Sequence, residues 1–200
     1  IGDWFFGGKR AALYDALERP LAHEPGSTFN YDSPAADLIS VILTRATQQD
    51  VRSFAVAHLF GPLGITDFEW EVDPAGFYRG SAGLIMRPRD VAKIGQLYLQ
   101  KGQWQQEQIL SSAWVEQSIR VHMDLGEGAG YGQLWWVSDR ESLHFFSAVG
   151  FGGQLLLVVP AHQLVVVAQQ EWWQIPAETA VKNSTDFYNK VFARVVESVK

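Results

Sequence analysis

The 200-residue chain contains no cysteine, so a catalytic side chain has to be serine, threonine, a carboxylate, histidine, lysine or tyrosine. A serine nucleophile needs a nearby base, which S-x-x-K enzymes place three residues after it. None of the thirteen serines has lysine at that spacing. The segment 79–83 resembles a nucleophile elbow, but G-x-S-x-G requires glycine where Arg79 stands. The chain therefore contains no recognisable activated serine.

The sequence also lacks the motifs of metal-binding and nucleotide-binding sites. The five histidines form no H-x-x-x-H pair, which argues against a zinc site. The glycine-rich segments 126–132 and 150–153 complete neither G-x-G-x-x-G nor a Walker pattern, and each precedes a predicted strand rather than a helix. Aspartate and glutamate are scattered, so no glycosidase-like carboxylate pair can be nominated. We predict no metal and no cofactor.

The composition of the chain argues against several classes of protein and partner. Hydrophobic residues make up 47% of the chain and charged residues 19%, which suits a globular core and argues against disorder. The chain has a net charge of -6 and so lacks the excess of basic residues that is typical of general nucleic-acid binders. A local basic patch is still compatible with this charge. No apolar run approaches the roughly 18 residues that a membrane helix needs. We therefore predict neither a nucleic-acid partner nor a transmembrane segment.

The first part of the chain, residues 1–125, is predicted to be mainly helical. Ser33 is expected as the N-cap and Pro34 as the first residue of a helix whose apolar residues include Leu38 and Ile42. Asp50 is expected to cap a second helix, which Gly61 and Pro62 end. Further helices are predicted at 11–17, 88–99 and 111–121.

The second part, residues 126–200, is predicted to hold antiparallel strands and a terminal helix. The strands are expected at 133–137, 144–146, 154–159 and 164–169, where aromatic and β-branched residues gather. The last two are continuously apolar, as in strands covered on both faces, and a turn at 160–163 joins them. An amphipathic helix at 183–199 is expected to cover the sheet.

Five segments, taken in their order along the chain, together resemble a known protein family, although no single segment is specific for it. They are residues 25–33, 60–65, 80–95, 131–136 and 150–154. In this order they resemble the serine β-lactamase and penicillin-binding-protein superfamily, in its class C-like branch with esterases and 6-aminohexanoate-dimer hydrolase. The resemblance implies a β-lactamase/transpeptidase-like α+β fold, in which a helical region accompanies an antiparallel sheet flanked by helices. It covers only the C-terminal part of that fold.

Members of the family resemble one another in three active-site motifs, and this chain has counterparts of two of them. Tyr31-Asp32-Ser33 matches the Y-x-S form of the second motif, which is similar to the hydrolase and esterase members. Ala148-Val149-Gly150 occupies the position of the K-T-G-like strand and would contact the substrate. Alanine replaces the usual lysine or histidine, which disfavours binding of a β-lactam carboxylate. By resemblance, the missing S-x-x-K motif lies upstream of this chain.

The resemblance also implies individual roles. Tyr31 would share proton transfer with the lysine, and Ser33 would hydrogen-bond within that cluster or hold the substrate. The backbone N–H of Phe151 would be the second oxyanion donor. Gly152 and Gly153 would let the strand edge approach a substrate. Each of these features also has a purely structural interpretation: Tyr31 as a packing residue, Ser33 as an N-cap and residues 150–153 as a hairpin loop.

The resemblance favours the C-terminal part of a serine hydrolase that cleaves a small ester or amide through an acyl-enzyme. A preceding segment, cleaved, separate or simply not included, would supply the serine and lysine. One alternative is a non-catalytic homologue that binds a ligand or partner in the former cleft, and another is a β-lactamase or D,D-peptidase. The resemblance suggests a periplasmic or secreted protein, with the cytoplasm left open. We also expect an uncovered sheet edge.

Overall fold

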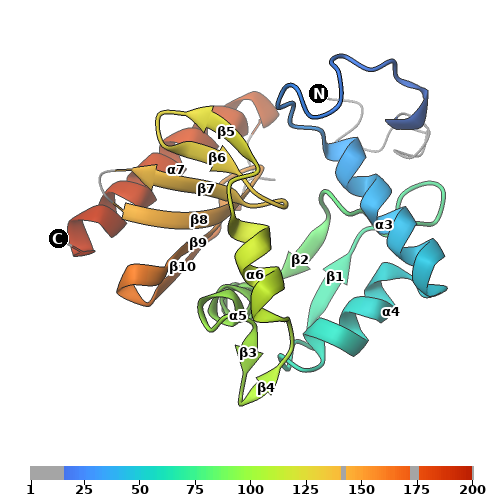
Figure 1. The fold of residues 1–200 in the computed structure, drawn as a ribbon, viewed down its shortest axis with the longest axis horizontal. Helices are drawn as coiled ribbons and strands as arrows, with labels where there is room; N and C mark the ends of the chain where they lie inside the picture. The colour runs from blue at the N-terminus through green and yellow to red at the C-terminus, as the bar shows by residue number, and fades with distance from the viewer. Residues whose placement is uncertain (1–15, 141–142, 172–175, 200) are drawn as a thin grey trace. The chain divides into compact units, whose positions relative to one another are not determined.

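The computed structural model describes residues 16–140, 143–171 and 176–199 of the chain (Figure 1). It divides into two compact units, Ile1–Met86 and Arg87–Lys200. Both combine helices with antiparallel strands, so the predicted α+β class is confirmed.

The first unit is built around a small aromatic core. Its elements are α3 (Ser33–Thr47), α4 (Val51–Ala55), a π-helical turn (Val56–Phe60), β1 (Phe68–Trp70) and β2 (Leu84–Met86). The two strands pair antiparallel, with Phe68 opposite Met86. Phe60 is buried, and its ring centroid lies 4.9 Å from that of Phe68 and 6.1 Å from that of Trp70. The short hairpin therefore packs against the end of the helical segment.

The start of α4 confirms the predicted N-cap at Asp50. One carboxylate oxygen accepts the Ser53 backbone N–H at 2.8 Å and the other accepts the Ser53 hydroxyl at 2.7 Å. The side-chain bond first, and then the backbone bond, hold the pKa of Asp50 below its ordinary value. At the other end, the Gly61 N–H donates to the Val56 carbonyl at 2.9 Å and closes the π-helical turn.

The buried face of α3 differs from the predicted one. The apolar spacing pointed to a face containing Leu38 and Ile42, but Ile42 is 64% exposed. The structure instead buries Asp37, Ser40 and Val41. The reason is that this face pairs two backbone groups of the segment 78–81: Asp37 accepts the Ser81 N–H, and the Ser40 hydroxyl donates to the Tyr78 carbonyl. An apolar surface would leave both groups unpaired.

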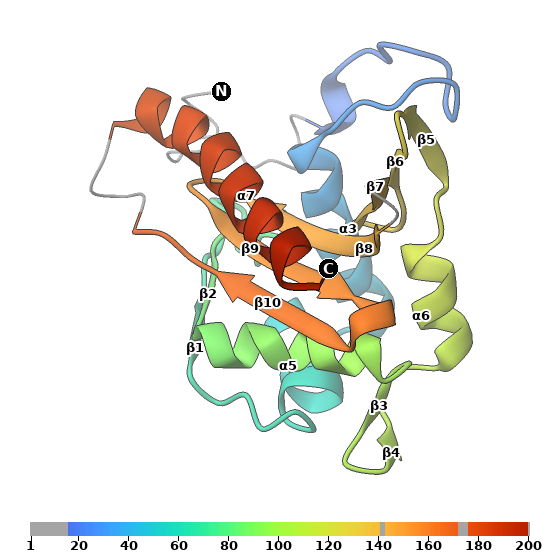
Figure 2. The ribbon, with the colours of Figure 1, turned by 90° about the vertical axis from the view of Figure 1, so that its left-hand side faces the viewer.

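The second unit is a six-stranded antiparallel sheet with helices on both faces. Its sheet strands are β5 (Met123–Gly126), β6 (Ala129–Tyr131), β7 (Trp136–Arg140), β8 (Leu143–Gly150), β9 (Gln154–Val159) and β10 (Leu164–Ala168), in the order β10-β9-β8-β7-β6-β5. The other elements are α5 (Pro88–Leu99), a hairpin of β3 (Gln103–Trp104) and β4 (Glu107–Gln108), α6 (Ser112–Ile119) and α7 (Ala177–Val199). Figure 2 shows α7 and α5 on opposite sides of β9 and β10.

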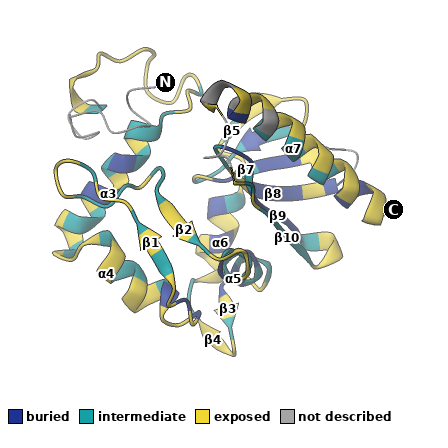
Figure 3. Cartoon of the chain, turned by 180° about the vertical axis from the view of Figure 1, so that it is seen from behind, coloured by how far each residue is buried: buried dark blue, intermediate teal, exposed yellow. Residues whose placement is uncertain are grey.

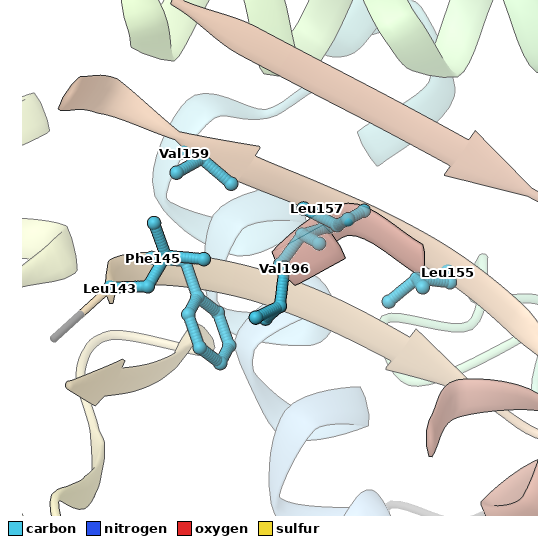
Figure 4. Packing of buried hydrophobic residues seen from close by; sticks show 7 residues of the cluster. Leu143, Phe145, Leu155, Leu157, Val159 and Val196 are labelled. Atoms are coloured by element: carbon cyan, nitrogen blue, oxygen red, sulfur yellow. The ribbon is translucent and has the colours of Figure 1, made fainter. Parts of the chain in front are cut away.

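The core of this unit lies on both faces of β9. Leu155, Leu157 and Val159 pack with Val195 and Val196 of α7 (Figure 4). On the opposite face, side chains of β9 pack with α5, so the strand is dark along its length in Figure 3. This confirms the prediction that the continuously apolar strands are covered on both sides. Burying each such side chain stabilises the fold by about 1.5–3 kcal/mol.

Several predicted boundaries shift. The strand expected at 133–137 is β7, Trp136–Arg140, because Leu134 has a φ of 64° and Trp135 turns into the core instead. The sheet begins at Met123, within residues that were assigned to the helical region. The terminal helix starts at Ala177 rather than 183. Most of the helix expected at 11–17 lies outside the described residues.

The predicted regions and the compact units divide the chain by different criteria. Residue 125 separates mostly helical sequence from mostly strand sequence, whereas the units divide after Met86. The helix α5 precedes the sheet in sequence, yet its residues Val91 and Ile94 pack beneath the sheet strands. Packing therefore assigns α5 to the second unit although its secondary structure resembles that of the first.

Candidate active site

Tyr31 and Ser33 lie at the start of α3 in the first unit. Tyr31 is 56% exposed, so it is not the packed core residue of the structural interpretation. Asp32, and not Ser33, is the N-cap, with extended backbone angles of -132° and 101°. Ser33 is instead the first residue of the helix and Pro34 follows it in the first turn, one position later than predicted.

Asp32 does not cap the helix with its side chain, because that carboxylate is used elsewhere. The Arg19 guanidinium donates through Nη2 to both oxygens of Asp32, at 3.0 and 2.9 Å. This charge-assisted bond ties the segment before the motif to the residue between Tyr31 and Ser33. The backbone that carries both candidate side chains is therefore fixed from two sides, by α3 and by Arg19.

The other candidate residues lie at the end of β8 in the second unit. Ala148 and Val149 are exposed and pair with Leu156 and Leu155 of β9. On the opposite side, the β7–β8 ladder ends at the pair of Trp136 and Ser147. Among the described residues, the last three positions of β8 are thus paired in a ladder with β9 only, which leaves one edge of this strand end open.

The loop that follows β8 is a three-residue hairpin. Gly150 is paired with Gln154, and residues 151–153 make the turn. Gly152 and Gly153 have φ values of 75° and 86°, which favour glycine. Both are buried, and a Cβ at position 153 would lie 2.9 Å from the Gln170 Oε1 and 3.1 Å from a Phe187 ring atom, so close packing adds to the backbone preference for glycine there. The hairpin interpretation is correct, and the role of the glycines toward a substrate stays a prediction.

The structure thus groups the candidate residues in two sets. Tyr31 and Ser33 belong to the first unit, and the residues from Ala148 to Gly153, with Phe151 in the turn, belong to the second. In the part of the chain that is described, no cluster of His, Asp and Glu could hold a metal ion. No helix within the same residues is long and apolar enough to cross a membrane.

Sequence reasoning missed a buried polar contact that holds α3. Asp37 accepts the Ser81 backbone N–H at 2.8 Å, and the Ser40 hydroxyl donates to the Tyr78 carbonyl. Both helix residues are buried. The available signal was a polar pair, Asp37 and Ser40, at i and i+3 on one helix face. The apolar residues on the neighbouring face gave a stronger pattern, so this polar pair was not identified.

Comparison with known proteins places these two sets of residues in one family. The family model described as Beta-lactamase matches residues 3–178, which include both. The chain belongs to the Beta-lactamase family. The predicted superfamily is confirmed, and the match spans both compact units of the chain.

The relatives of this Beta-lactamase family chain include hydrolases. The 6-aminohexanoate-dimer hydrolase of Paenarthrobacter ureafaciens is 28% identical over 177 residues, covering 82% of this chain and 45% of that protein. A Bacillus anthracis protein provisionally described as a 6-aminohexanoate-dimer hydrolase matches with a TM-score of 0.73 and 22% identity, over 92% of this chain and 49% of that one. EstCE1, a hydrolase with promiscuous acyltransferase activity, matches with a TM-score of 0.64 and 17% identity, over 85% of this chain and 58% of that one. The chain spans about half the length of the first two.

Proposed function

We propose that this chain is the C-terminal part of a serine hydrolase of the esterase or amidase type. The enzyme works through an acyl-enzyme, with the serine and lysine of S-x-x-K supplied by residues outside these 200. Membership of the Beta-lactamase family and the hydrolase relatives support the reaction class. The name of the Paenarthrobacter relative points to an amide, because the dimer of an amino acid is joined through its amine and carboxyl groups.

The observation that carries the proposal is the open edge at the end of β8. Ala148, Val149 and Gly150 pair with β9 alone, and the first two are exposed. An extended ester or amide can lie along such an edge and form main-chain hydrogen bonds with it. The hairpin at 151–153 then supplies a backbone N–H, that of Phe151, at the end of the bound segment.

The reaction divides into acylation and deacylation. In acylation, the serine hydroxyl attacks the carbonyl carbon while its proton passes to the cluster of lysine and Tyr31. The negative carbonyl oxygen accepts hydrogen bonds from the serine amide and from Phe151. Collapse expels the alcohol or amine, which takes up the proton. In deacylation, water attacks the acyl carbon and gives its proton to the same cluster. The bond to the serine oxygen then breaks, the cluster returns the proton to that oxygen, and the carboxylic acid leaves.

Two candidate side chains, one from each unit, favour neutral substrates. Ala148 offers no cation for a carboxylate, unlike the lysine that is usual in penicillin-recognising members. Ser33 offers a hydroxyl that donates to or accepts from a carbonyl or amide group. An ester or linear amide therefore fits better than a β-lactam, whose carboxylate would lack a positive partner at this position.

Intact mass spectrometry of the natural preparation, with a fluorophosphonate serine probe, tests the proposal. The expected result is a label on the serine of an S-x-x-K sequence, either in a longer chain that contains these residues or in a second chain that copurifies under native conditions. A matched digest locates the label. An unlabelled protein that binds ligand without turnover would instead support a non-catalytic homologue. Nitrocefin hydrolysis by the complete protein would support the β-lactamase alternative.

A further inference from the structure

Asp37 is a buried carboxylate that the proposed reaction does not use. It lies in α3 and is 5% exposed, and its Oδ1 accepts the Ser81 backbone N–H at 2.8 Å. Its second oxygen, Oδ2, and the Ser81 hydroxyl are both buried, and neither has a hydrogen-bond partner among the described residues. Leaving two such atoms unpaired is costly, especially when one belongs to a carboxylate.

A second aspartate–serine pair in the same unit shows how the two atoms can be satisfied together. Asp50 accepts the Ser53 N–H at one oxygen and the Ser53 hydroxyl at the other. Asp37 and Ser81 already form the first of these two bonds. Rotation of the Ser81 side chain about χ1 brings its hydroxyl toward the carboxylate that its own N–H binds. By analogy with Asp50 and Ser53, we expect one such rotation to pair both orphaned atoms.

The contact between α3 and the segment 78–81 is close as well as polar. The Ser40 hydroxyl donates to the Tyr78 carbonyl one turn further along the helix. A Cβ at Gly80 would overlap the Ala36 carbonyl oxygen and lie 3.4 Å from the Asp37 Cα. Only glycine allows this approach, so the segment is held against the helix backbone at Ala36 and by side chains at Asp37 and Ser40.

Ser33 and Asp37 are four residues apart and so lie on the same face of α3. We infer that Asp37 is a positioning residue that binds both the N–H and the hydroxyl of Ser81, and so fixes the first turn of α3 and the Tyr31-Asp32-Ser33 motif. This inference rests on the proposed function of that motif. A carboxylate suits the task because its two oxygens accept both bonds in a fixed direction.

The test uses the complete hydrolase, with D37L as the shape-matched variant that accepts no hydrogen bond and D37N as the conservative variant. In D37L, exchange of the Ser81 amide is expected to accelerate about 10- to 100-fold. The value of kcat should fall about tenfold or more, because Tyr31 is misplaced for proton transfer, and any rise in KM should be smaller, because Ser33 is only one of the proposed substrate contacts. D37N still accepts the Ser81 N–H and should keep slow exchange and most of kcat.

S118A is the structural control. Ser118 is a buried serine of the second unit whose hydroxyl donates to the Val115 carbonyl. Its removal is expected to lower the free energy of unfolding without changing kcat. S81A decides the matter if D37L does not fold, because it deletes only the hydroxyl. It should lower kcat about two- to tenfold, and an unchanged kcat would overturn the inference.

The outcomes separate this inference from the proposed function. Slow Ser81 exchange in folded D37L, or accelerated exchange with an unchanged kcat, overturns the role of Asp37 alone. Full turnover in Y31F overturns the proton-transfer role of the Tyr31-Asp32-Ser33 motif on which this inference rests, whereas the absence of a probe-labelled serine in the complete protein overturns the proposed function itself. Loss of turnover in Y31F with full kcat in D37L leaves the hydrolase proposal intact and removes only the positioning role.

Discussion

Tyr31 is the residue on which the proposed chemistry depends most. Y31F removes the phenol oxygen and keeps the ring, so proton transfer to and from the serine is lost while the shape of the site is kept. We expect kcat/KM of the complete hydrolase to fall about 10²- to 10⁴-fold, the range for a general acid or base. Steady-state hydrolysis of a chromogenic ester measures it.

The matched control for this prediction is Y188F in α7. The Tyr188 ring stacks on Phe192 with an interplanar angle of 7°, and the substitution keeps that contact. Turnover should be unchanged in Y188F. Equal rates in Y31F and Y188F would show that Tyr31 has no part in proton transfer.

Asp50 gives the chain a stability that depends on pH. Its lowered pKa means that folding favours the ionised form, so the stabilisation is present at neutral pH and is lost as the pH falls below about 4. D50A should cost about 1 kcal/mol at pH 7, the usual effect of losing an N-cap. The difference between D50A and the unmodified chain should shrink in acid, as measured by urea unfolding at several pH values.

D50N separates the cap from the charge. Asparagine also caps helices well, so D50N should be nearly as stable as the unmodified chain at pH 7. Its stability should not show the additional loss in acid that the Asp50 carboxylate causes. If D50A and the unmodified chain differ by a constant amount from neutral to acid pH, the lowered pKa is not linked to folding.

Residue-scale prediction succeeded where a side chain bonds its own neighbours. Asp50 caps its helix as predicted, and its hydrogen bonds to Ser53 are local. Prediction failed at Ser33 by one position, because Asp32 takes the cap backbone while its carboxylate binds Arg19. The Asp37–Ser81 contact joins residues 44 positions apart. No local pattern specifies such a partner, since it depends on how the chain returns to the helix.

At the scale of elements, the strand β9 should contribute most to stability in the second unit. Leu157 is fully buried between neighbouring strands and α7, so L157A removes apolar contacts and leaves a cavity. We expect it to lower the free energy of unfolding by about 2–5 kcal/mol. L125A makes the same deletion on β5, where Leu125 is 37% exposed, and should cost less than about 1 kcal/mol. Denaturant unfolding compares them, and similar losses would contradict this view of the core.

The elements with a strong hydrophobic signal were the ones that sequence predicted best. The continuous apolar runs of β9 and β10, and the turn between them, are confirmed almost to the residue. The short hairpins β1–β2 and β3–β4 were missed, because two or three residues carry too little periodicity. On α3 the apolar spacing was real but did not identify the buried face, since hydrogen bonds to a distant segment decided it.

At the scale of the whole molecule, the two compact units and the family match explain why the candidate site could be predicted only in part. The motif at Tyr31 and the strand end at Ala148 were found through their resemblance to the family, and each forms a coherent local structure. They belong to different units, so their joint geometry is a property of the arrangement of the units and not of either motif. Local sequence patterns carry no information on that arrangement.

The sheet edges predict how the isolated 200-residue chain behaves. At one edge, β5 carries Asp124 and a register shift between Asp124 and Gly126, both of which hinder strand pairing. At the other, β10 carries five apolar, half-buried residues and no charge, so we expect two copies to pair there.

Light scattering should show association, and β10 amides should gain hydrogen-exchange protection as concentration rises. A168K at the end of β10 should shift the chain toward monomer, whereas L125K on β5 should not. A monodisperse monomer that unfolds cooperatively at every concentration would refute pairing, because an open apolar edge would then have no measurable consequence.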